Sequence, residues 1–427
     1  MVTILSNIEY PYSKKWDKTK DYVTFDVKNV NSALVNGLRR CIISQVKTVG
    51  IRTEPYDKCQ IDIIQNDTPL HNQFLSHRIS MIPINVPDIN KFNVDDYELI
   101  IDMDNTTNFP KDVTTEDIKV RKISENKILS VNETRKLFPP NPITNEFILL
   151  TRLKPKYYQF GNLTDRSVIE SMKEEGNVKQ FNTMRLYLKA KISLGNGEIN
   201  GHYNPSSCAT FVNKIDPDKA KLAEKQYIID ENNKLIRNGL TALSEESIKH
   251  RFETSVLDRY FYTDENGEPY WFTFRIESVG VIPPLLIFHR AIDILKGKVN
   301  NFRSNLISGD QNKIEKGAST DLPHAYELKI LEEDDTLGNL IQTYLTDMFA
   351  NYQSNDKLLN YIGYVKIHPL QKIIKMTIQP INNSMKWEDV LEQIINPGCQ
   401  HIIKILNKLQ KYLEDSPQFT AELHRIK

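Results

Sequence analysis

Few residues in this 427-residue chain have the type and spacing that enzyme chemistry needs. His368 is a candidate general base or metal ligand, because an imidazole can fill either role near neutral pH. No second histidine, cysteine or acidic residue stands near it at the spacing of a metal-ligand or catalytic pair. We therefore interpret His368 as a hydrogen-bonded histidine at the end of a strand.

Acidic residues gather at Asp95-Asp96 and at Asp102-Met-Asp104, a pattern that could bind magnesium. An EF-hand calcium loop starting at Asp102 would need glycine at its sixth position and glutamate at its twelfth, where this chain has Thr107 and Val113. We interpret the segment as a solvated strand and loop.

The four cysteines are scattered along the chain without a C-x-x-C pair, at Cys41, Cys59, Cys208 and Cys399. This usage predicts reduced, buried thiols in a cytosol-like compartment. We expect no metal and no cofactor.

Wider features exclude several classes of protein. The chain has no G-x-S-x-G, P-loop or G-x-G-x-x-G segment, so we expect it not to be an enzyme by itself. Lys plus Arg equals Asp plus Glu at 55 each, which argues against a protein whose main task is to grip nucleic acid. No stretch approaches the roughly eighteen apolar residues of a membrane helix. Two alternatives stay open: an independent nucleic-acid-binding transcription factor, and an enzyme with an unrecognised site in the middle of the chain.

Two segments far apart in the chain each predict an amphipathic helix with a glycine one turn in, residues 31–40 and 333–340. Each carries one apolar stripe, formed by Leu34, Leu38, Ile42 and Val46 in the first and by Leu337, Leu340, Ile341, Tyr344, Leu345 and Met348 in the second. Glycine inside a helix costs about 1 kcal/mol relative to alanine, so Gly37 and Gly338 are best explained by close approach of another backbone. The pattern predicts two helices that cross each other.

The first segment, Asn31-Ser-Ala-Leu-Val-Asn-Gly-Leu-Arg-Arg40, resembles the N-x-x-x-N-x-L-R-R segment of the α subunit of bacterial RNA polymerase, its archaeal counterpart and the third-largest subunit of eukaryotic RNA polymerase II. The second, Asp334-Asp-Thr-Leu-Gly-Asn-Leu340, is similar to the D-H-T-L-G-N-L signature of their small partner in archaea and of the eleventh eukaryotic subunit. Residues 68–83, 274–280 and 361–370 resemble further motifs of the same families, in the expected order. Both halves of a heterodimer are thus expected in one polypeptide.

The resemblance and the periodicity together imply an α+β chain with two α-subunit-type dimerisation domains fused in one polypeptide. Residues 1–53 and 213–303 are expected to form the larger-subunit domain, interrupted by an inserted, mainly β domain at 54–212. Residues 304–323 are polar and without periodicity, which indicates a linker, and 324–427 form the smaller-subunit domain. Asn396-Pro397 predicts a helix start with Asn as cap, and a charged stretch at 213–250 predicts exposed helices.

Periodicity predicts further elements. Residues 22–27 and 270–276 are expected to be strands, with Val23, Phe25 and Val27 alternating with polar residues in the first. A helix from about Pro284 is expected to place one set of apolar residues on one face, and the helix beyond Pro397 another: Phe288, Ile292, Leu295, Val299 and Phe302 in the first, and Ile402, Ile405, Leu409 and Tyr412 in the second.

The resemblance also implies roles for particular residues. Arg39, Arg40 and Asn36, with Arg78 in the inserted domain, are expected to contact the large polymerase subunits, because arginine offers several planar donors. The expected intramolecular dimer interface consists of Gly37, Leu38, Leu337, Gly338, Leu340, Ile341, Phe288, Leu295, Ile402 and Leu409.

By the same resemblance, the chain is expected to be a non-catalytic assembly platform that holds the two largest polymerase subunits together. Small zinc-bearing subunits are further expected partners, with DNA reached only through the complex and no membrane contact. The cysteine-rich loop of many relatives is missing, as is the catalytic N-A-D-F-D-G-D motif, which the family carries on its largest subunit. Fused versions of this pair are typical of nucleocytoplasmic large DNA viruses. The resemblance therefore implies the virion and host cytoplasm as the location if the chain is viral, and otherwise the nucleus or cytosol.

Overall fold

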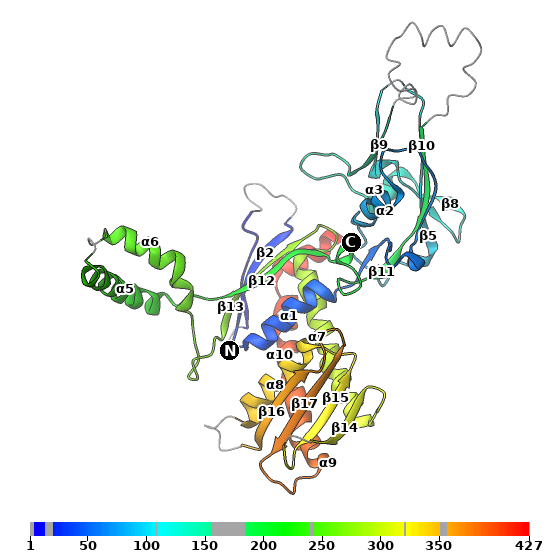
Figure 1. Cartoon of the computed structure of the whole chain (residues 1–427). Coiled ribbons are helices and arrows are strands. Elements are labelled where there is room, and N and C mark those ends of the chain that lie inside the picture. Colours follow the sequence, from blue (N-terminus) through cyan, green and yellow to red (C-terminus); the bar gives the residue numbers. More distant parts are fainter. Residues whose placement is uncertain are drawn as a thin grey trace, which may run out of the picture.

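The computed structural model describes residues 4–12, 20–107, 109–154, 184–239, 243–319, 322–350 and 357–426. Helices and antiparallel sheets both occur throughout these ranges, which confirms the predicted α+β class. Figure 1 shows a central group of helices and sheets from which two further parts extend. No helix in the described ranges is long and apolar enough to cross a membrane.

The first sheet is antiparallel and joins strands from three distant parts of the chain. Its order is β1 (Leu5–Glu9), β2 (Tyr22–Lys28), β13 (Trp271–Ser278) and β12 (Ser206–Asn213). In β2, Val23, Phe25 and Val27 are fully buried, as their alternation with polar residues predicts. Phe25 stacks on Phe274 of β13, so this face of the sheet contributes aromatic rings to the core.

Helices α1 (Ser32–Ser44), α7 (Pro284–Ser308), α8 (Asp335–Leu345) and α10 (Asn396–Glu414) form the centre of the molecule. Helix α1 packs on both α7 and α8, and α7 packs along α10. The apolar stripes of all these helices join one hydrophobic core, to which both halves of the chain contribute. The expected buried face of α7, which includes Phe288, Ile292, Leu295, Val299 and Phe302, is confirmed.

The second sheet belongs to the last third of the chain. Its antiparallel strands run in the order β14 (Ile314–Ala318), β15 (Tyr326–Leu331), β17 (Ile373–Pro380) and β16 (Leu359–Lys366). Alternate residues of β17, Ile374, Met376 and Ile378, are buried in the same core as the central helices. The short α9 (Trp387–Val390) leads towards α10, and α11 (Pro417–Ile426) ends the chain against α7.

The middle of the chain has a hydrophobic core of its own. A five-stranded sheet runs in the order β4 (Ile61–Asn66), β10 (Met184–Lys191), β5 (Tyr97–Asn105), β7 (Lys119–Lys122) and β8 (Lys127–Ile128). Two strand pairs, β6 (Lys111–Thr114) with β9 (Leu149–Leu153) and β11 (Ser193–Gly195) with β3 (Thr48–Gly50), and helices α2 (Asn72–Ser80) and α3 (Val131–Leu137) complete this part. A separate hairpin of α5 (Pro217–Arg237) and α6 (Glu245–Ser255) confirms the predicted exposed helices.

Four predicted boundaries differ from the structure. The part of the chain with the second core begins before residue 54, because β3 pairs with β11 and Val49 and Ile51 lie in that core. Strand β12 pairs with β13 of the first sheet, so the part of the chain with the second core ends before Ser206 and not at residue 212. The expected linker at 304–323 is largely regular: α7 continues to Ser308, Gly309 ends it with a φ of 67°, and β14 pairs with β15. Only Ile314 of β14 is buried, because β14 is an edge strand, and an edge strand need not show apolar alternation.

Helix α10 begins at Asn396, as predicted, but the prediction that Asn396 caps it after a break in the chain is wrong. Asn396 has helical backbone angles, and a π-helical turn over Leu391–Ile395 joins α9 to α10 without a break. Pro397 lacks the N–H that an α-helix needs, and a wider π turn just before it accommodates that loss. The Asn396 side chain accepts a hydrogen bond from Arg303 of α7 instead of capping its own helix.

The cysteines agree with expectation only in part. All four are free, and Cys41 and Cys399 are buried, which raises the pKa of each thiol to about 12. Cys59 and Cys208 are half-buried, because Cys59 precedes the edge strand β4 and Cys208 lies on the edge strand β12. The prediction of buried thiols is therefore wrong for that pair.

Candidate assembly interface

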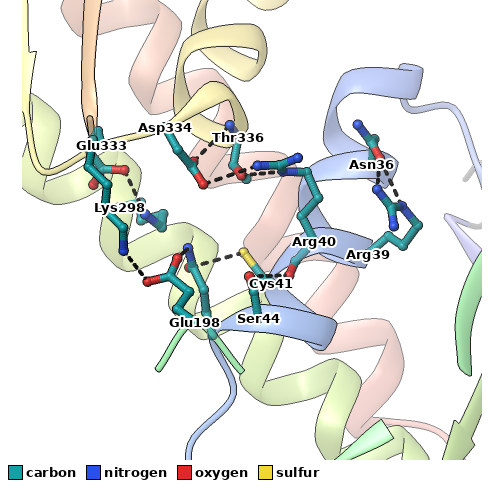
Figure 2. A network of polar contacts seen from close by, with 12 residues as sticks. Asn36, Arg39, Arg40, Cys41, Ser44, Glu198, Lys298, Glu333, Asp334 and Thr336 are labelled. Carbon is teal, nitrogen blue, oxygen red and sulfur yellow. Dashed lines mark hydrogen bonds and ion pairs between the residues drawn. The ribbon is translucent and has the colours of Figure 1, made fainter. Parts of the chain in front are cut away.

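The end of α1 meets the start of α8 through a polar contact that Figure 2 shows from close by. Asp334 caps α8, and its side chain accepts a hydrogen bond from the backbone N–H of Thr336 at 3.0 Å. From α1, the Arg40 guanidinium donates to Thr336 Oγ1 at 2.8 Å and to Asp334 Oδ2 at 3.2 Å. One arginine therefore binds both the cap and the first turn of the other helix.

The charges around this contact come from several elements. Burial pushes the pKa of Asp334 upward, but hydrogen bonds from Thr336 and the charges of Lys298 and Arg40 outweigh burial and hold that pKa below its usual range. Next to it, Lys298 of α7 forms an ion pair with Glu333 at 2.7 Å, and both side chains are more than four-fifths buried. Two ion pairs thus join the first half of the chain to the segment that opens α8.

A second polar contact extends this network. Glu198, in the turn after β11, accepts a hydrogen bond from Gln45 at the end of α1 at 3.1 Å. The other oxygen of Glu198 pairs with Lys372, just before β17, at 2.7 Å. Sequence reasoning missed Glu198, because a lone glutamate in a turn is usually solvated and nothing in the local pattern marks its partners.

Beneath the polar network, the structure brings the predicted apolar interface residues together. Leu38 of α1, Leu337, Leu340 and Ile341 of α8, Phe288 and Leu295 of α7, and Ile402 and Leu409 of α10 are all buried in one hydrophobic cluster. Burial of such side chains stabilises a core by about 1.5–3 kcal/mol each. This cluster and the polar contacts above it together make the candidate interface between the two halves.

The two helix glycines have different surroundings from those expected. A Cβ on Gly37 would lie 3.4 Å from Leu295 Cδ2, which is ordinary contact with a side chain of α7. A Cβ on Gly338 would lie 2.6 Å from the ring of Tyr364 on β16. The expectation that both glycines admit another helix backbone is therefore wrong, because Gly338 makes room for an aromatic ring of its own half.

The predicted partner-binding residues divide into three groups. Arg39 donates to Asn36 Oδ1 on its own helix, at 3.0 and 2.9 Å, and Figure 2 shows this pair pointing away from the network. Arg40 instead donates to Thr336 and Asp334 within the chain, as described above. Arg78, on α2, is exposed but donates to the backbone carbonyls of Leu149 and Leu150, so it also braces β9. Arg39 and Asn36 are the pair best placed for an external partner.

The described part of the chain offers no obvious reaction centre. No group of three or more His, Cys, Asp or Glu side chains in those ranges could hold a metal ion. His368 is exposed, and its Nδ1 accepts a hydrogen bond from the backbone N–H of Leu370 at 3.2 Å.

Arg40→Ala is expected to lower the free energy of unfolding by about 1 kcal/mol, because it removes a charged contact whose arginine is 38 % exposed. The lowered pKa of Asp334 means that this contribution is complete above an ordinary carboxyl pKa of about 4 and is lost as pH falls through the lower folded-state value. Urea unfolding at neutral and acid pH should show the difference between the two proteins shrink in acid. An equal loss of unfolding free energy in Arg39→Ala would contradict the assignment of this stabilising contact to Arg40.

The chain is similar to subunits of RNA polymerases. A family model described as the RNA polymerase Rpb3/Rpb11 dimerisation domain matches residues 24–299. A "conjugation stage-specific protein" of Tetrahymena thermophila is 20% identical over 327 residues, covering 69% of this chain and 94% of that protein. The DNA-directed RNA polymerases I and III subunit RPAC1 of Saccharomyces cerevisiae is 22% identical over 301 residues, 66% of this chain and 83% of that protein.

An archaeal relative matches a shorter stretch. The DNA-directed RNA polymerase subunit Rpo3 of Pyrococcus horikoshii is 29% identical over 91 residues, which are 20% of this chain and 32% of that protein. The chain therefore spans about a third of this archaeal relative, whereas it spans most of the yeast and Tetrahymena proteins. Since the family model matches well over half of the chain, the chain belongs to the RNA polymerase Rpb3/Rpb11 dimerisation domain family.

Proposed function

We propose that the chain is a non-catalytic subunit of a multisubunit DNA-directed RNA polymerase and serves as an assembly platform for the two largest subunits. The observation that carries this proposal is the packing of α1 against α8 within a chain of the Rpb3/Rpb11 family. The yeast and archaeal relatives are named as polymerase subunits, which supports the same role here.

The platform is an intramolecular heterodimer of a larger and a smaller subunit type. In support, each half contributes a four-stranded antiparallel sheet and two of the central helices to one core. The larger-type domain comprises residues 1–47 and about 206–308, with the inserted domain between them, and the smaller-type domain extends from β14 to residue 427. The turn at 309–313 replaces the longer linker that the sequence indicated.

Covalent fusion changes how such a pair behaves. Two separate chains lose an estimated 4–15 kcal/mol of translational and rotational freedom on association, whereas a short connection gives an effective concentration near millimolar. The two halves should therefore stay paired on dilution and always in equal number. That property suits a subunit that begins the assembly of a larger complex.

The proposed external contacts are made by exposed groups on α1. Arg39 and Asn36 form one adjacent polar pair, and each is half-exposed. We assign this pair to one of the two largest subunits, and small zinc-bearing subunits complete the assembly. A viral origin, with action in the virion and host cytoplasm, fits the fusion of the two subunit types.

Arg39→Glu is expected to reduce recovery of the large subunits while changing the free energy of unfolding by less than about 0.5 kcal/mol. The experiment is affinity purification of the tagged chain from its native or infected cell, with mass spectrometry and an RNA synthesis assay on the eluate. Lys127→Glu, an exposed lysine on the edge strand β8, gives the same charge change on another surface.

A folded wild-type chain recovered without large subunits would contradict the proposal. If Arg39→Glu and Lys127→Glu reduced recovery of the large subunits equally, the proposal that α1 makes this contact would be wrong. Arg39 is changed alone because reversal at Arg40 would also break the contact with Asp334 inside the chain.

A further inference from the structure

The hairpin of α5 and α6 extends from the first sheet as an arm, and Figure 1 shows it well apart from the rest of the molecule. Its base is fixed in several places. Lys219 donates to Thr263 Oγ1 at 2.8 Å, Ile215 bridges to Phe261, and Tyr262 stacks on Trp271 of β13 at 4.7 Å. The arm is therefore anchored to a strand of the main core.

One face of α5 is covered by α6. Ile248 and Phe252 of α6 are buried, and the ring of Phe252 lies 5.5 Å from that of Tyr227 on α5. Ala220 is the buried residue of α5 near the base of the hairpin. These contacts are enough to explain why the two helices pair.

The opposite face of α5 carries large aliphatic side chains that no part of the described chain covers. Leu222, Ile229 and Ile236 are 71%, 54% and 65% exposed. Their spacing of seven residues places them in one row along one side of the helix. Single exposed aliphatic residues are ordinary, but an aligned row on an extended arm is typical of a protein-binding surface.

The borders of this row are mainly basic. Lys221, Lys225 and Arg237 are exposed, and none of them is in an ion pair found among the described residues. Two carboxylates at the edges are a smaller negative contribution: Asp218, which is exposed one turn before Leu222, and Asp230, which accepts a hydrogen bond from Gln226. A helix that packed on the row would meet cations along its sides.

We propose that the outer face of α5 binds an amphipathic helix of a partner protein, whose apolar stripe is flanked by acidic side chains. Helix-on-helix recognition of this kind uses apolar anchors at heptad spacing and complementary charges beside them. The charges disfavour a second copy of this chain. Parallel pairing of two α5 helices would place Lys225 against Lys225, and antiparallel pairing centred on Ile229 would place Lys221 against Arg237.

The test uses the full chain and a labelled synthetic helix with Leu at positions a and d of each heptad and Glu at e and g. Fluorescence anisotropy should show saturable binding, weakened at least about tenfold when Leu222→Gln and Ile229→Gln are combined. The same peptide with Lys at e and g should bind at least about tenfold more weakly than the Glu peptide. Leu370→Gln, at an 89% exposed residue outside the arm, should leave binding unchanged.

Glutamine keeps helix propensity, and far-UV circular dichroism of the double variant checks that the arm remains folded. The proposal is overturned if the Glu peptide does not bind, or if it binds the double variant as well as the wild type. It is also overturned if the wild type self-associates in sedimentation and the double variant does not, since the row would then bind a second copy. None of these outcomes depends on the polymerase assignment.

Discussion

Glu422→Ala is expected to lower the free energy of unfolding by about 3 kcal/mol, a large loss for a single substitution. Glu422 lies on α11, close to the end of the chain, and its side chain is only 1% exposed. It accepts a hydrogen bond from Tyr10 Oη at 2.6 Å and from the backbone N–H groups of Leu285 and Leu286 at 3.1 and 3.3 Å. Its removal takes this acceptor away from the backbone N–H groups in the first turn of α7.

The position of Glu422 explains the size of this effect. Helix α7 begins after Pro283, whose side chain cannot cap it, so the first N–H groups need an acceptor from elsewhere. A carboxylate at a helix N-terminus also interacts favourably with the helix dipole. Glu422 therefore caps the longest central helix from a distant part of the chain, and it holds α11 and the segment after β1 against that helix.

Tryptophan fluorescence during urea unfolding measures this effect, because the chain has no tryptophan between residues 54 and 212 and Trp387 lies in the core that contains α7. Glu422→Gln keeps an uncharged acceptor and should lose only about 1 kcal/mol. Glu392→Ala changes an exposed glutamate in the π turn and serves as the control. A loss in Glu422→Ala no larger than in that control would refute the capping role.

Local periodicity was sufficient to predict most of the central elements. The predicted stripes of α1 and α7 are buried, and so are Ile402 and Leu409 of α10, whereas Ile405 and Tyr412, predicted on the same face of α10, are only partly buried. Alternation in the same way predicted β2 and β13. These patterns are visible because each helix or strand of this core buries one face and exposes the other.

The remaining features depend on which elements meet in space. The sequence predicted an external partner for Arg40, and only the approach of α8 brings Thr336 and Asp334 to it instead. From sequence alone, Glu422 resembles a surface residue of a polar C-terminal helix. Its buried capping role becomes visible only in the structure, where α7 lies beside it. Strand β14 and the π turn before Pro397 were missed because neither has a periodic local pattern.

Gly338→Ala is expected to lower the free energy of unfolding by about 2 kcal/mol, whereas Gly37→Ala should leave it unchanged or raise it by up to about 1 kcal/mol. Both glycines lie in helices, where alanine is the better residue, so their surroundings decide the sign. The added methyl at Gly338 would be 2.6 Å from the Tyr364 ring, a distance that requires the ring to move. At Gly37 the nearest atom is Leu295 Cδ2 at 3.4 Å, which is normal contact.

Unfolding of Gly338→Ala, Tyr364→Leu and the double variant forms a cycle that isolates this contact. If the ring is the cause, Gly338→Ala should cost much less in the Tyr364→Leu background, because the smaller side chain leaves room for the methyl. An equal cost in both backgrounds would place the strain elsewhere in α8. The cycle therefore tests what Gly338 makes room for. The structure indicates the ring of Tyr364, which lies on the sheet of the same half, whereas the sequence alone predicted the backbone of a crossing helix.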